Sequence, residues 1–171
     1  NRGHLKDIVP ALIEAEISWE AVDIDPLGNR MPVIDLMSIT RALLSPADRI
    51  AWLAVLRAPF CGLSLKDLVV LTQAKESSGK QPKCILEKLY QWQQSPAKFS
   101  QLSADGSDIL HRISPLICNA WSNRDTDNLR NLVEQLWIAL GGPATLLNQR
   151  DIYDARRYLD LLESWEIAGT I

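Results

Sequence analysis

Four basic residues have the type and placement to contact phosphate. They lie across consecutive predicted helices and the connector that follows, and they are Arg41, Arg49, Arg57 and Lys66. Arg57 follows an apolar helix and precedes Ala58-Pro59, so it could point from a helix end toward a phosphate group. The alternative is that Arg57 favours the helix dipole, or pairs with Asp48 or Asp67. Phosphate contacts of this kind position a nucleic acid without reading its sequence.

The overall charge limits how much nucleic acid the chain could hold. The 171 residues carry 18 Lys+Arg against 21 Asp+Glu, a formal net charge of -3. Proteins that coat nucleic acid are usually basic, so a DNA contact would be weak and confined to a local patch. With 47% hydrophobic and 23% charged residues the composition is that of a globular protein. No run of roughly 20 apolar residues lacks charges, which excludes a membrane-spanning helix.

Other kinds of chemistry find little support in the sequence. Neither usual nucleotide-binding glycine loop occurs, and 78–80 (Ser-Gly-Lys) lacks the upstream glycine and preceding strand of a phosphate loop. No metal-ligand spacing joins the three cysteines, which are interpreted as buried hydrophobes of a reducing cytoplasm. Two acid pairs leave a two-carboxylate enzyme as an open alternative, although acids on turns are more often solvated. They are Asp23 with Asp25 and Asp105 with Asp108.

Helical periodicity dominates the chain after Pro32 and predicts a mainly α protein of six to eight helices. The predicted helices cover about 33–44, 46–56, 64–72, 82–92, 105–119, 127–140 and 149–166. We expect Ser45 to cap the second of these, with Pro46 at its first position and Ile50, Leu53 and Ala54 facing inward. We expect Ser64 and Asp67 to form a capping box. Asp125 or Asp127 is the expected cap of the helix that ends at 140.

The first thirty residues have a different pattern. A helix over about 4–16 and one short strand over 18–24 precede the turn residues 25–29. One strand is not a sheet, so this strand requires partners from elsewhere. The expected division is therefore a small α/β piece at 1–30 and a helical body at 31–171. Since the chain also begins without Met, the simplest hypothesis is a piece of a longer protein.

Two blocks of the sequence resemble a known family. The first is 33–64, which contains Asp35-Leu36, Arg41-Ala42-Leu43, Pro46 with Asp48, Leu56-Arg57 with Pro59, and Gly62-Leu63. The second is 137–144, Trp-Ile-Ala-Leu-Gly-Gly-Pro-Ala. Together they are similar to the inserted helical subdomain, called 2B, of UvrD/Rep-type superfamily 1 DNA helicases. The nearest branch is that of RecB- and AddA-like exodeoxyribonuclease V beta subunits.

The resemblance implies a parent protein that hydrolyses ATP with Mg²⁺ to unwind DNA in repair and recombination. Residues 1–30 would then belong to the second RecA-like motor domain, with Arg2 as the only candidate for its phosphate-sensing arginine. The fragment itself would hold no cofactor and no catalytic residue. Its implied partners are DNA, through the four basic residues, the motor domains of the same chain, and other subunits of a helicase–nuclease complex. A stand-alone helical protein-interaction module is the alternative function.

Overall fold

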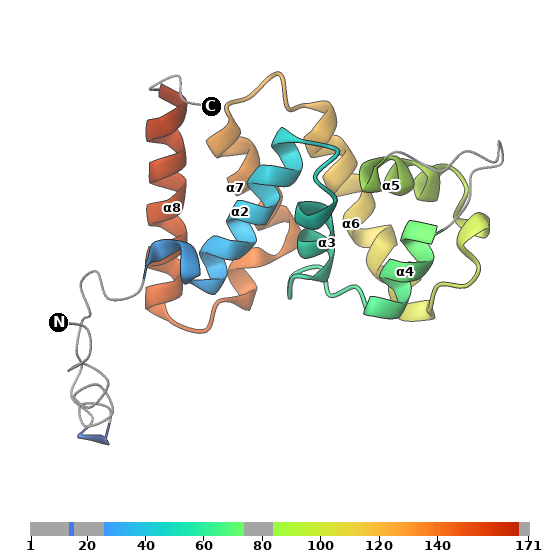
Figure 1. The fold of residues 1–171 in the computed structure, drawn as a ribbon, viewed down its shortest axis with the longest axis horizontal. Helices are drawn as coiled ribbons and strands as arrows, with labels where there is room; N and C mark the ends of the chain where they lie inside the picture. Colours follow the sequence, from blue (N-terminus) through green and yellow to red (C-terminus); the bar gives the residue numbers. More distant parts are fainter. Residues whose placement is uncertain (1–13, 16–25, 74–83, 168–171) are drawn as a thin grey trace.

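The computed structural model describes residues 14–15, 26–73 and 84–167, and these parts are mainly helical (Figure 1). Their α-helices are α2 (Met31–Leu44), α3 (Arg49–Arg57), α4 (Leu65–Gln73), α5 (Ile85–Gln94), α6 (Ala104–Ser122), α7 (Leu129–Leu140) and α8 (Gln149–Ile167). Short 3-10 turns are η2 (Leu27–Asn29), η3 (Pro96–Phe99) and η4 (Gly142–Thr145). The prediction of a mainly α protein is confirmed. The predicted strand 18–24, Arg2 and most of the predicted helix 4–16 lie outside the described residues.

The helices share one apolar core. Helix α2 packs against α3, α7 and α8, while α6 packs against α5 and α7. In Figure 1, α8 lies at one end of the elongated molecule, and α4 and α5 lie at the other. Five helices each contribute a leucine or valine that is at most 2% exposed: Leu36, Leu56, Leu110, Val133 and Leu159. Because the helices share this core, their relative positions are fixed, and so are the contacts between the polar groups at their ends.

Helix α3 begins later than the sequence predicts. It starts at Arg49, and its N-cap is Asp48, whose Oδ1 accepts a hydrogen bond from the Ala51 amide at 3.0 Å. The expected cap, Ser45, instead ends α2 and begins a turn, in which its carbonyl accepts from the Asp48 amide at 3.2 Å. An aspartate three residues later therefore replaces the predicted Ser45–Pro46 start, because its carboxylate reaches a first-turn amide.

The inward face of α3 also differs from the prediction. Ile50 is 73% exposed, whereas Trp52 is 1% exposed and packs edge-on against Trp121, with ring centroids 6.4 Å apart. Burying the large indole removes more apolar surface from water than burying Ile50 would. The burial of Trp52 therefore sets which face of α3 points into the core. The residues that follow inward with it are Ala51, Val55 and Leu56.

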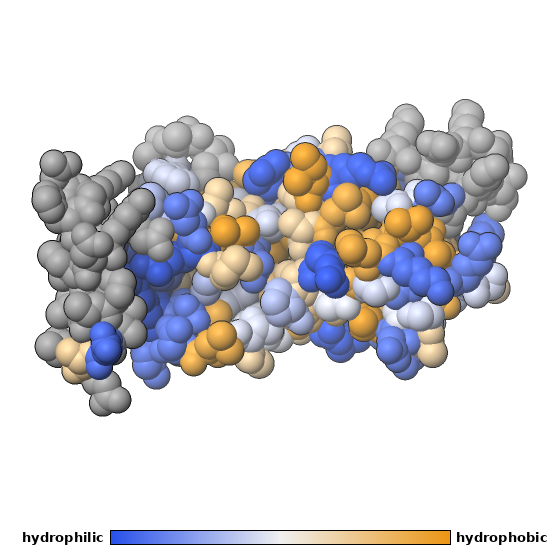
Figure 2. All heavy atoms as spheres, turned by 60° about the horizontal axis from the view of Figure 1, so that its bottom comes forward, coloured by the Kyte–Doolittle hydropathy of each residue, from blue (hydrophilic) through white to orange (hydrophobic). Residues whose placement is uncertain are grey.

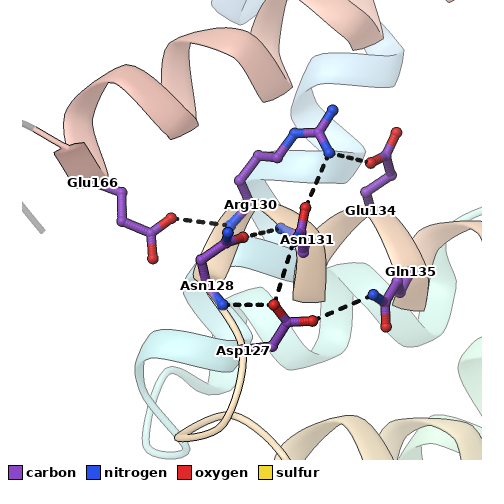
Figure 3. A network of polar contacts seen from close by, with 7 residues as sticks. All are labelled: Asp127, Asn128, Arg130, Asn131, Glu134, Gln135 and Glu166. Atoms are coloured by element: carbon purple, nitrogen blue, oxygen red, sulfur yellow. Dashed lines mark hydrogen bonds and ion pairs between the residues drawn. The ribbon is translucent and has the colours of Figure 1, made fainter.

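A polar network holds the start of α7 (Figure 3). The cap is Asn128, rather than Asp125 or Asp127, and its side chain accepts from the Asn131 amide at 2.8 Å. Asp127 stands behind it and accepts from the Asn128 amide at 2.8 Å. From α8, Glu166 accepts from the Leu129 amide at 2.8 Å, which joins the end of α8 to the start of α7.

None of the helices in the described ranges is long and apolar enough to cross a bilayer.

Candidate nucleic-acid interface

Arg41 is engaged by an acid of the next helix start. Its Nη2 lies 2.7 Å from Asp48 Oδ2, and its Nε donates to the same oxygen at 2.9 Å. The Ala51 amide and the Arg41 side chain together hold the pKa of Asp48 below its usual value. The charge of Arg41 is therefore partly neutralised by the acid that caps α3. Of the four basic candidates, Arg41 is therefore the least available to bind a phosphate.

Arg57 closes the connector between α3 and α4. Its Nη1 donates to the Leu63 carbonyl at 3.2 Å, while the Leu63 amide donates back to the Leu56 carbonyl at 3.0 Å. Gly62 turns the chain with a φ of 78°, a left-handed value that favours glycine. The Leu-Arg-x-Pro and Gly-Leu pattern of this region thus builds one hydrogen-bonded turn. Arg57 uses one of its five N–H donors in the turn, and the others remain for further contacts.

Arg112, from the middle of α6, fixes the same connector from the other side. Its Nη2 donates to the Phe60 carbonyl at 3.0 Å, and its Nη1 donates to the Leu140 carbonyl at 3.2 Å. Leu140 is the last residue of α7, where free carbonyls favour a positive charge. Arg112 was not among the residues predicted from the sequence. Its placement directly before the buried Ile113, on the border of an apolar helix face, is the only local signal that it carried.

Lys66 lies in the first turn of α4 beside a buried acid. Asp67 is only 2% exposed, and it accepts from the Ser64 hydroxyl at 2.6 Å while its own amide donates to that hydroxyl at 3.1 Å. The predicted cap by Ser64 is therefore confirmed, but the Asp67 carboxylate bonds to the Ser64 hydroxyl rather than to the Ser64 amide that a capping box would use. The carboxylate also accepts from the Ser103 amide at 2.8 Å and the Ser103 hydroxyl at 2.9 Å. Because Ser103 caps α6, one acid joins the starts of two helices.

The four basic candidates fall at the two ends of α3. Arg41, through its bond to Asp48, lies next to Arg49 at the start, and Arg57 and Lys66 flank the connector at the other end. Eight residues of helix separate Arg49 from Arg57, about 12 Å along the axis. Arg49 and Lys66 are exposed. The four residues therefore form two separate positively charged sites rather than one enclosed phosphate-binding site. Arg2, the expected nucleotide contact, lies outside the described residues.

Titratable groups near the connector are tuned by burial. Burial raises the pKa of the Cys61 thiol to about 12, with the Arg112 charge opposing the shift and the Asp35 charge adding to it. Cys61 is thus a neutral thiol at ordinary pH, as expected for a buried hydrophobe. Burial also raises the pKa of the Asp35 carboxyl to about 6. In the described parts of the chain, no group of three or more His, Cys, Asp and Glu side chains could hold a metal ion.

Asp35→Asn is expected to stabilise the chain at pH 7.5 by about 1 kcal/mol, after discounting the shift for partial solvent access. The folded pKa of Asp35 lies above its unfolded value, so Asp35 costs stability as the pH rises through about 6. The amide escapes this cost, and the difference should vanish below about pH 4. Urea unfolding at both pH values measures it, with the exposed Asp160→Asn as control. An equal difference at both pH values would contradict the assignment.

Comparison with protein-family models and with curated proteins gave no match.

Proposed function

We propose that residues 31–171 form the helical accessory subdomain of an ATP-dependent DNA helicase of the UvrD/Rep type, in the RecB/AddA-like branch. Residues 1–30 would belong to its second motor domain. The subdomain contacts duplex DNA or regulates unwinding in cytoplasmic repair and recombination, while ATP and Mg²⁺ are bound by other parts of the parent protein. The subdomain itself contributes no catalytic group.

The observation that carries this proposal is the bridge made by Arg112. The two sequence blocks that resemble the family lie far apart in the chain, at 33–64 and 137–144. One guanidinium joins them, because it donates to the Phe60 carbonyl in the first block and to the Leu140 carbonyl in the second. Two resembling blocks that meet in space behave as one structural unit. This supports a single subdomain as the source of the resemblance, rather than two chance similarities.

The gene that surrounds this chain tests the proposal directly. A helicase requires a Gly-x-x-x-x-Gly-Lys-Thr loop encoded upstream and a motif VI arginine encoded downstream. We expect both in one reading frame with these residues, and we expect ATP hydrolysis by the full product to depend on the loop lysine. A reading frame that encodes neither element would refute the proposal.

The isolated chain is expected to bind duplex DNA weakly, with a Kd of about 10⁻⁴ to 10⁻⁶ M at physiological salt. Arg49→Ala with Arg57→Ala should reduce the dependence of log K on log salt by about 2, because two phosphate contacts disappear. Fluorescence anisotropy across a salt series measures this change. Arg57→Lys with Arg49→Lys is the matched control that keeps the charge. If the alanine pair keeps the salt dependence of the original chain, these arginines do not contact DNA.

An exposed apolar face favours the second candidate, a protein-interaction module. Four outward side chains of α2 are 39% to 63% exposed, namely Met31, Ile34, Met37 and Leu44. In a helicase, this face would pack against the motor domains of the same chain. In a free-standing module, it would bind another protein. The surrounding gene separates the two functions, since only the first requires motor sequences in the same frame.

A further inference from the structure

The outward face of helix α8 carries a cluster of cations around an aromatic ring. Arg150, Tyr153 and Arg157 recur at the spacing of one helical stripe, and Arg156 flanks it. All three arginines are exposed, and Tyr153 is 60% exposed. Figure 2 shows hydrophilic residues gathered at the end of the molecule where α8 lies. We call these four residues the α8 arginine face.

Two acids near this face, Asp151 and Asp154, are engaged elsewhere, while the exposed Asp160 lies one turn beyond Arg156 without forming an ion pair to it. Asp151 accepts from the Leu147 amide at 3.1 Å, as part of the turn that starts α8. Asp154 is 7% exposed and faces Arg30, whose Nε lies 3.7 Å from its Oδ2. Among the described residues, no ion pair joins Arg150, Arg156 or Arg157 to an acid. The positive charge of the α8 arginine face is therefore presented to solvent.

The exposed charges along α8 are separated by sign. The exposed charges of its first half are arginines, and those of its second half include Asp160 and Glu163. The helix dipole acts mainly on the first and last turns, where α8 carries Arg150 and Asp151 at its start and Glu166 at its end, so it does not account for Arg156 and Arg157 in the middle. Glu166 is explained by its bonds to α7, whereas within the described residues no ion pair engages Arg150, Arg156 or Arg157. Exposed arginines that no ion pair neutralises are the kind of surface that attracts a phosphate group.

We propose that the α8 arginine face binds the phosphate backbone of duplex DNA, an inference that rests on the proposed function and names a second contact surface for it. Seven residues of helix separate Arg150 from Arg157, about 10 Å along the axis. That length matches about three phosphate steps along one strand, at 3.4 Å each. Guanidinium groups bind phosphate in a bidentate manner, and the Tyr153 hydroxyl adds a neutral donor.

The test compares two variants of the whole 171-residue chain by anisotropy with a duplex, over a salt series. Arg150→Gln, Arg156→Gln and Arg157→Gln together should weaken binding at 50 mM salt about tenfold or more and lower the salt slope by 2 to 3. The triple Arg→Lys variant keeps the charges and should keep most of that slope. Circular dichroism confirms that both variants retain their helices.

Each outcome separates this inference from the proposed function. If the glutamine triple binds as the original chain does, while Arg49→Ala with Arg57→Ala weakens binding, the α8 proposal fails and the helicase proposal stands. If the lysine triple loses as much affinity as the glutamine triple, charge is not the cause and the α8 proposal fails. The α8 proposal is also overturned if the original chain binds no duplex at 50 mM salt. An acidic protein is then the remaining candidate partner for this face. The helicase proposal itself is decided by the surrounding gene.

Discussion

Asp67→Ala is expected to lower the free energy of unfolding by about 3 kcal/mol, because it removes the carboxylate that joins the cap residues of two helices. The carboxylate accepts three hydrogen bonds, from the Ser64 hydroxyl, the Ser103 amide and the Ser103 hydroxyl. Without it these donors, which belong to serines at the surface, lose a charged acceptor that is itself only 2% exposed, and the starts of α4 and α6 are no longer joined. Chemical unfolding at pH 7 measures the loss.

The pH dependence identifies the carboxylate as the cause. Burial on its own raises the pKa of Asp67, but the bonds from Ser103 and Ser64 and the charge of Lys66 outweigh it, so the pKa is lowered. A lowered folded pKa means that the stabilisation is present at neutral pH and disappears as the pH falls below about 4. The gap between Asp67→Ala and the original chain should therefore narrow in acid. Asp108→Asn, an exposed acid of α6, is the control and should change stability by less than about 0.5 kcal/mol.

Gly142→Ala is expected to destabilise the chain by about 3 kcal/mol through overpacking. A Cβ at this position would overlap Nε1 and Cδ1 of the Trp137 indole. Trp137 is itself 6% exposed in the core, so the ring has no free space to enter. The backbone at Gly142 must lie directly against this ring for α7 to end and η4 to begin. Thermal and urea unfolding measure the effect, and near-ultraviolet circular dichroism reports the displaced indole.

The neighbouring glycine supplies the matched control. Gly141 has a φ of 91°, and no atom lies within 4 Å of a Cβ built on it. Gly141→Ala should therefore cost only the left-handed backbone strain, about 1 kcal/mol. If both alanine variants lose the same stability, the contact with Trp137 is not what requires Gly142. The Trp137–Gly142 contact gives a physical reason for a glycine five residues after this tryptophan.

Most of the helices could be predicted from the sequence because their signals are local. The apolar stripe of α7 and the glycines that follow it mark a helix that ends at Leu140, and the structure has it there. The Ser64–Asp67 cap was predicted for the same reason, since its two residues are three positions apart. The start and the inward face of α3 were predicted less well from local signals. Ser45 was the predicted cap, but Asp48 caps α3, and packing of the Trp52 side chain fixed which face of α3 points inward.

The sequence by itself determined a mainly helical chain and which residues carry charge. Only the tertiary structure decided where those charges act. It brought Ser103 to Asp67 across 36 residues and directed Arg112 at two distant carbonyls, and within the described ranges it left the α8 arginines without an ion pair. A helical hydrogen bond depends on residues four apart, whereas these contacts depend on how several helices bury one core together. The spacing of residues along the chain therefore fixes the helices, and their packing selects which side chains remain available for a ligand.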